Sequence, residues 1–130
     1  MNTSTNRRLT IMRWAAGVGL AILFVVLLLS YGLLWLRAGF ADEQTRNYEM
    51  SRNKALQSDA AGAATCLDFV VYYYPSGTKQ EAGSGLDRTV ERVRRSAIRD
   101  IIAHLRTLTG EDLGESPEPW IAKYARQSRG

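Results

Sequence analysis

The sequence predicts an all-α protein in which one N-terminal transmembrane helix leads to a small domain of two to three helices. Three observations predict this fold. Residues 14–36 contain no charged side chain. Residues 84–109 repeat apolar side chains at spacings of three and four, the period of an amphipathic helix. Residues 69–74 have strand composition, but no second segment offers a strand to pair with them.

The predicted membrane span covers residues 14–36 and follows a polar N-terminal tail, residues 1–13. Trp14 and Trp35 lie at its two ends, as in the aromatic belts of membrane proteins. They are 21 residues apart, which is about 31 Å in a helix and matches a hydrocarbon core of about 30 Å. We therefore predict a membrane-anchored, single-pass protein.

Two alternatives to the anchor stay open. The first is a buried helix of a globular core, although such a helix seldom lacks charge on every face. The second is a cleaved signal peptide, for which Gly39-Phe40-Ala41 before Asp42 offers a small-residue cleavage site. The apolar region of a signal peptide has about 7–15 residues, however, and this run is longer. A signal-anchor is therefore favoured.

The flanking charges only weakly orient the span. Three arginines precede it and four basic residues closely follow it: Arg7, Arg8 and Arg13, then Arg37, Arg46, Arg52 and Lys54. Since long tails cross a membrane largely regardless of charge, we expect a cytoplasmic N-terminus and an exported C-terminal domain. Small-residue pairs in the span, Ala15 with Gly19 and Gly17 with Ala21, would also permit self-association of two helices.

Charge and cysteine usage narrow the class of function. The chain has a net charge of +4, but residues 37–130 carry 14 basic against 13 acidic side chains, a net of +1. This balance gives no reason to expect nucleic-acid binding. The single cysteine, Cys66, excludes an intrachain disulfide. We expect it to be a small buried apolar side chain rather than a reactive thiol.

Residues 37–58 are predicted to be a stalk or linker, or a continuation of the membrane helix, that buries little. Residues 59–74 fit a helix because Ala63, Cys66, Leu67 and Val70 recur at helical spacing. Asp59 would cap this helix, and Pro75 would end it at Tyr74. A strand over residues 66–74 is the alternative. Residues 75–84 are predicted to be a loop.

Residues 84–109 form the clearest helix of the domain. Ser84 and Asp87 resemble a capping box, and Gly110 is suited to the C-cap. One apolar stripe runs along it: Leu86, Val90, Val93, Ala97, Ile98, Ile101, Ile102, Leu105 and Leu108. Arg88, Arg92, Arg95 and Arg99 lie off the stripe, and Glu91 and Arg95 form a favourable i,i+4 pair.

A second turn and a short last helix complete the predicted domain, residues 59–130. Ser116 and Pro117 are suited to the N-cap and first helical position. Trp120, Ile121 and Tyr124 share one face, which we expect to pack on the 84–109 stripe.

The segment from Leu105 to Trp120 resembles the closing motif of HEAT-repeat-like helical domains in bacterial proteins. The residues that match are Leu108, Thr109, Gly110, Asp112, Leu113, Gly114, Pro117 and Trp120. The resemblance covers about 16 residues and implies a structural terminator without activity. Because a solenoid needs about three repeats to bury a core, it also implies completion by a partner or a second copy.

Several candidate chemical motifs are better explained by structure. Ser76 and Lys79 fit the Ser-x-x-Lys pattern of penicillin-binding proteins, but the other motifs of that class are missing, and a turn is favoured. Gly77-Thr78-Lys79 lacks the order of a phosphate loop. His104 is the only histidine, with Asp100 four residues before it, so a metal site is not expected.

Two clusters offer binding surfaces. The arginines at 92, 94, 95 and 99 suit an anionic partner or lipid headgroups, but a solvated face is favoured. The three tyrosines at 72–74 suit a contact surface, with at least one in the core.

We therefore expect a membrane-anchored interaction or accessory protein, or else a structural subunit of a larger membrane complex. We expect no enzyme, catalytic residue, cofactor, metal or small-molecule substrate. The expected partners are the lipid bilayer and a protein or second copy.

Overall fold

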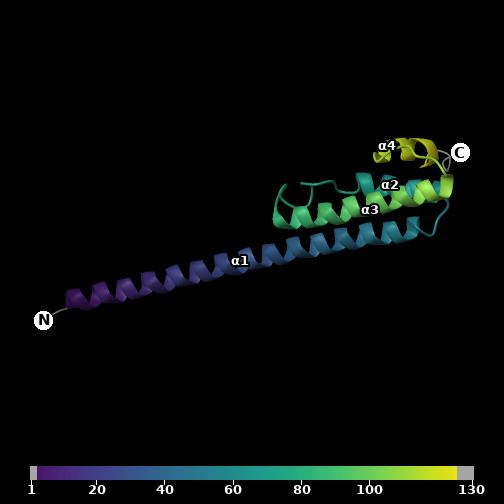
Figure 1. The fold of residues 1–130 in the computed structure, drawn as a ribbon. Coiled ribbons are helices and arrows are strands. Elements are labelled where there is room, and N and C mark those ends of the chain that lie inside the picture. Colours follow the sequence, from purple (N-terminus) through teal and green to yellow (C-terminus); the bar gives the residue numbers. More distant parts are fainter. Residues whose placement is uncertain (1–2, 126–130) are drawn as a thin grey trace. The chain divides into compact units, whose positions relative to one another are not determined.

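In the computed structural model of the protein, residues 3–125 are described, so the ends of the predicted tail and domain, residues 1–2 and 126–130, lie outside the described residues. It contains helices α1 (Thr3–Ala55), α2 (Ala60–Tyr72), α3 (Gly85–Thr109) and α4 (Pro117–Trp120) and a π-helical turn, η1 (Ile121–Ala125) (Figure 1). No strand occurs among these residues, so the all-α prediction is confirmed. The chain divides into two compact units, Met1–Leu36 and Arg37–Gly130.

The first unit contains the apolar part of α1. Every side chain from residue 10 to residue 36 is exposed, including the leucines and both tryptophans. An 18-residue window of this helix reaches a mean hydropathy of 2.5, and no other helix in residues 3–125 is both long and apolar enough to cross a membrane. A helix that is apolar on all sides and buries none of them has the composition of a membrane anchor.

The segment after the span is part of the folded domain. It continues as helix to Ala55, one of the two predicted alternatives, but the expectation that it buries little is wrong. Ala41, Gln44, Tyr48 and Ala55 are buried at helical spacing. The pattern was missed because two of these side chains are only methyl groups and one is polar. The larger apolar side chains nearby, Phe40 and Met50, are exposed.

Helix α2 confirms the helical interpretation of residues 59–74. Asp59 is the N-cap, and its carboxylate accepts a hydrogen bond from the Gly62 amide at 2.8 Å. The buried face consists of Ala63, Ala64, Cys66, Leu67 and Val70. The helix ends at Tyr72 and not at Tyr74, because the chain is already extended at Tyr73 and has a φ of 39° at Tyr74. The backbone before Pro75 therefore leaves the right-handed region two residues early.

Helix α3 lies against α2 (Figure 1). Ser84 is its N-cap and accepts a hydrogen bond from the Asp87 amide at 3.2 Å, and Gly110 closes it with a φ of 70°. Val90, Ala97, Ile101, Ile102 and Leu105 are buried, so the predicted stripe is the core face. Leu108 is an exception and is exposed.

The C-terminal segment closes the core from the other side of α2. Trp120 is fully buried, and its indole Nε1 donates a hydrogen bond to the Gly114 carbonyl at 3.0 Å. Ser116 occupies the N-cap of α4 but makes no capping bond with its side chain. The expected packing on α3 is only partly right, because η1 packs mainly against α2.

Candidate functional site

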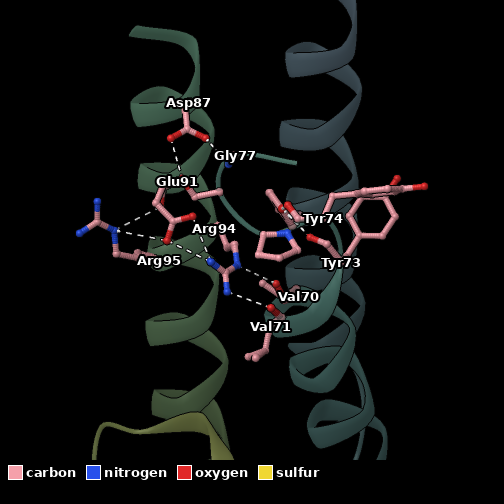
Figure 2. Close-up of polar contacts among 12 residues, drawn as sticks. Val70, Val71, Tyr73, Tyr74, Gly77, Asp87, Glu91, Arg94 and Arg95 are labelled. Atoms are coloured by element: carbon pink, nitrogen blue, oxygen red, sulfur yellow. Dashed lines mark hydrogen bonds and ion pairs between the residues drawn. The ribbon is translucent and has the colours of Figure 1, made fainter. Parts of the chain in front are cut away.

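The 76–84 loop is organised around the carboxylate of Asp87. This carboxylate accepts hydrogen bonds from the Ser76 hydroxyl at 2.6 Å and from the Gly83 amide at 2.9 Å. It also accepts one from the Gly77 amide at 3.1 Å (Figure 2). A capping box would require it to bind the Ser84 amide, which instead bonds the Glu81 carbonyl. Only the Ser84 half of the predicted capping box therefore forms, and the Asp87 carboxylate accepts hydrogen bonds from the loop instead.

The two residues of the Ser-x-x-Lys pattern, Ser76 and Lys79, make separate contacts. Ser76 donates its hydroxyl proton to a carboxylate, while the Lys79 ammonium lies over the Tyr74 ring at 4.1 Å and the Phe40 ring at 5.3 Å. A nucleophilic serine needs a base within hydrogen-bond reach, and here the aspartate is already used by two loop amides. The Ser76 hydrogen bond and then the Gly83 amide hold the pKa of Asp87 below its ordinary range. These hydrogen bonds of Ser76, Gly77 and Gly83 hold the turn of the loop.

Arg94 belongs to the interior and not to an arginine face. Its guanidinium donates to the carbonyls of Val70 at 3.1 Å and Val71 at 2.8 Å, in the last turn of α2, and also pairs with Glu91 at 3.0 Å (Figure 2). The side chain is only 15% exposed. Because the last carbonyls of a helix lack partners in the helix, this arginine caps α2 and fixes it to α3.

The Glu91–Arg95 pair expected from the sequence is therefore the weaker of the two ion pairs that Glu91 makes. Its closest approach is 3.9 Å, and the Arg95 side chain is 68% exposed. Arg92, Arg95 and Arg99 remain exposed, as predicted. The set of four arginines is thus split, with three on the surface and Arg94 in the packed interface.

Tyr48, in the part of α1 beyond the span, contacts the residues that follow α2. Its hydroxyl donates to the Tyr73 carbonyl at 2.8 Å, and its ring meets the Tyr73 ring edge-on at 6.0 Å. Asn47 donates to the Tyr73 hydroxyl at 2.9 Å. Burial raises the pKa of Tyr48. Tyr73 is therefore the partly buried tyrosine of the three, and Tyr72 and Tyr74 are exposed, as the sequence suggested.

The candidate pair of His104 and Asp100 does not form. Asp100 pairs with Arg52 of α1, and His104 Nε2 lies 3.5 Å from the Ser58 carbonyl. No cluster of three potential metal-ligating side chains occurs within residues 3–125. Both residues therefore join α3 to the end of α1 and its following turn.

An open groove runs beside the Arg52–Asp100 pair between the end of α1 and α3. It has a volume of about 410 Å³. Its lining residues are Glu49, Arg52, Asn53, Val93, Ser96, Ala97 and Asp100. Small-molecule sites are mostly apolar clefts with a few polar groups, whereas charged and amide side chains make up most of this lining. The groove suits a polar contact with another macromolecule better than a small substrate.

Cys66 behaves as an apolar core residue. It is 8% exposed on the buried face of α2, and burial raises the pKa of its thiol. The thiolate, which is the reactive form, is therefore disfavoured. This agrees with the interpretation of the cysteine as a small buried side chain.

A comparison of the chain with known protein families, curated proteins and solved structures finds no match. The resemblance of residues 105–120 to HEAT-like closing motifs thus stays a prediction. Within the domain this segment packs through Trp120 and Leu113 against the core.

Proposed function

We propose that this protein is a single-pass membrane-anchored interaction or accessory protein. The observation that supports it is the uncharged apolar half of α1, whose side chains are exposed throughout, joined to a packed domain that begins directly after it. The anchor would hold the domain within a short distance of the bilayer, where its polar surface can meet a partner.

The best-supported contact surface is the domain rather than the span. The groove beside Arg52 and Asp100 is open and polar, and Arg92, Arg95 and Arg99 are exposed on α3. Exposed charges of both signs suit a transient protein contact, which is usually polar at its rim. The alternative is a structural subunit that contacts a larger membrane complex through the apolar part of α1, for which its small-residue pairs would allow close helix packing.

Exchange of the span separates the two proposals. Residues 14–36 would be replaced by a polyleucine span of equal length, and both proteins would be captured from membranes in mild detergent. We expect the same partner to co-purify with both forms, because the domain is intact in each. Loss of the partner from the polyleucine form alone would favour the subunit proposal. Release of the native chain by alkaline carbonate would refute the anchor itself.

The proposed orientation has an exported domain and needs a reporter other than Cys66, which is buried. Thr107 lies exposed near the end of α3 and suits a single cysteine in a Cys66→Ala chain. We expect a membrane-impermeant maleimide to label Thr107→Cys in intact cells. Labelling only after lysis would reverse the orientation.

A further inference from the structure

Lys79, Tyr74 and Phe40 form a cluster at the loop end of the domain, which we call the loop cluster. The Lys79 ammonium lies over both aromatic rings, and both rings are close to half exposed, at 44% for Phe40 and 45% for Tyr74. Tyrosine rings are enriched at the headgroup level of membranes, and a lysine can lie along an apolar surface while its ammonium reaches the headgroups.

The covalent chain fixes how far this cluster can be from the bilayer. Phe40 lies four residues beyond Leu36, the last residue of the apolar run, and both belong to α1. At about 1.5 Å per residue this separation is about 6 Å, and the headgroup layer on each side is about 5–8 Å thick. With Leu36 at the edge of the hydrocarbon core, Phe40 would reach the headgroup layer, and Lys79 is in contact with the Phe40 ring.

The loop is held in this position by the domain and not by Phe40 alone. Gln44, one turn further along α1, donates to the Tyr74 carbonyl at 3.5 Å and is itself bonded to Gln80 at 2.9 Å. Both glutamines are buried. Asp87 fixes the rest of the loop through Ser76, Gly77 and Gly83. A rigid loop loses little conformational freedom on meeting the membrane surface.

We propose that the loop cluster docks on the headgroup layer of the bilayer that anchors the chain, with the two rings at the headgroup level and the Lys79 ammonium at a lipid phosphate. This inference rests on the proposed membrane anchor. It adds a second membrane contact beside the membrane span itself.

Headgroup quenching in nanodiscs tests the proposal on the full chain. Single cysteines at Leu28, Thr78 and Thr107, each in a Cys66→Ala chain, would carry an environment-sensitive fluorophore. The nanodiscs would contain phosphatidylcholine with a fraction bearing a nitroxide on the headgroup. We expect strong quenching at Thr78, beside Lys79, and little at Thr107, because α3 is 25 residues and about 36 Å long and Thr107 lies near its far end.

A matched pair of double variants isolates the cluster. Phe40→Ser with Lys79→Glu should reduce quenching at Thr78 to the level at Thr107. Met50→Ser with Lys54→Glu also removes one large apolar side chain and reverses one lysine, on exposed positions of α1 further from the span, and should leave quenching at Thr78 unchanged. Circular dichroism would check that both double variants keep the helical content of the parent chain.

The outcomes separate this inference from the proposed anchor. A nitroxide on the acyl chain, used in a second set of nanodiscs, should quench Leu28 if the chain spans the bilayer. Quenching of Leu28 together with equal, weak headgroup quenching at Thr78 and Thr107 would overturn the docking and leave the anchor intact. Absence of acyl-chain quenching at Leu28, with the protein recovered apart from the nanodiscs, would overturn the anchor.

Discussion

Replacing Tyr48 tests whether the chain beyond the membrane span belongs to the folded domain. The side chain is fully buried and donates a hydrogen bond to the Tyr73 carbonyl at 2.8 Å. Tyr48→Phe keeps the ring and leaves that carbonyl without its donor, which costs about 1–2 kcal/mol. Tyr48→Ala also removes the ring from the core, which costs roughly 3–5 kcal/mol.

These losses convert into measurable shifts of the melting temperature. For a domain of 60–100 residues, 1 kcal/mol corresponds to about 4–8 °C, so Tyr48→Phe should lower the melting temperature by about 4–16 °C. Thermal unfolding of the full chain in detergent would be followed by Trp120 fluorescence, with Trp14 and Trp35 replaced by Phe so that only the core tryptophan reports. Circular dichroism would check that the exchange leaves the parent fold unchanged.

The control lies on the same helix. Met50 is 62% exposed two residues further on, so Met50→Ala should change the free energy of unfolding by no more than about 0.5 kcal/mol. If Tyr48→Ala unfolds at the same midpoint as Met50→Ala, residues 37–55 are a spacer and the reasoning from burial is refuted.

Three further predictions address the domain. Arg94→Ala should destabilise the domain by about 2–4 kcal/mol in chemical denaturation, because two α2 carbonyls and Glu91 lose their partner. Arg95→Ala, on the exposed face, should have little effect. Equal effects of the two substitutions would contradict the buried role of Arg94. Asp87 has a lowered pKa, so its stabilising contribution is present above the unfolded pKa of about 4 and is lost as the pH falls through the lower folded pKa. Asp87→Asn should therefore lower stability at neutral pH and flatten the fall below about pH 4 in acid titrations followed by circular dichroism, and an unchanged acid limb would count against it. Trp120→Ala should cost roughly 3–5 kcal/mol and broaden or abolish cooperative unfolding, measured by calorimetry, and a sharp unshifted transition would show that this side chain is not a core residue.

Much of the fold could be predicted because the signals are local. A capping Asp59 or Ser84 acts on amides within three residues, and Gly110 ends α3 through its own backbone angle. The apolar stripe of α3 repeats often enough to identify its buried face. The end of α2 was predicted two residues late, because the rule for the residue before proline limits where a helix can continue and does not fix where it stops.

The candidate site was less predictable because its contacts join residues far apart in the chain. Arg94 looks like its neighbours at 92 and 95 in the sequence, and only its position one turn from Glu91 and against the end of α2 makes it a buried cap. A possible signal was its spacing of four from Val90, which places it beside the buried face. The ring contacts of Lys79 could not be predicted from the patterns in which it stands, since the two rings come from α1 and from Tyr74.

The sequence by itself determined the apolar span, the helices that became α2 and α3 and most of the inward faces of these two helices, because length, charge and helical period are properties of short stretches of chain. Tertiary structure alone decided that α1 continues into the core through Tyr48, that Asp87 organises the loop and that Arg94 caps α2. Each of these depends on a carbonyl, amide or ring supplied by another element. These contacts form only when packing brings distant segments of the chain together, so no local sequence pattern predicts them.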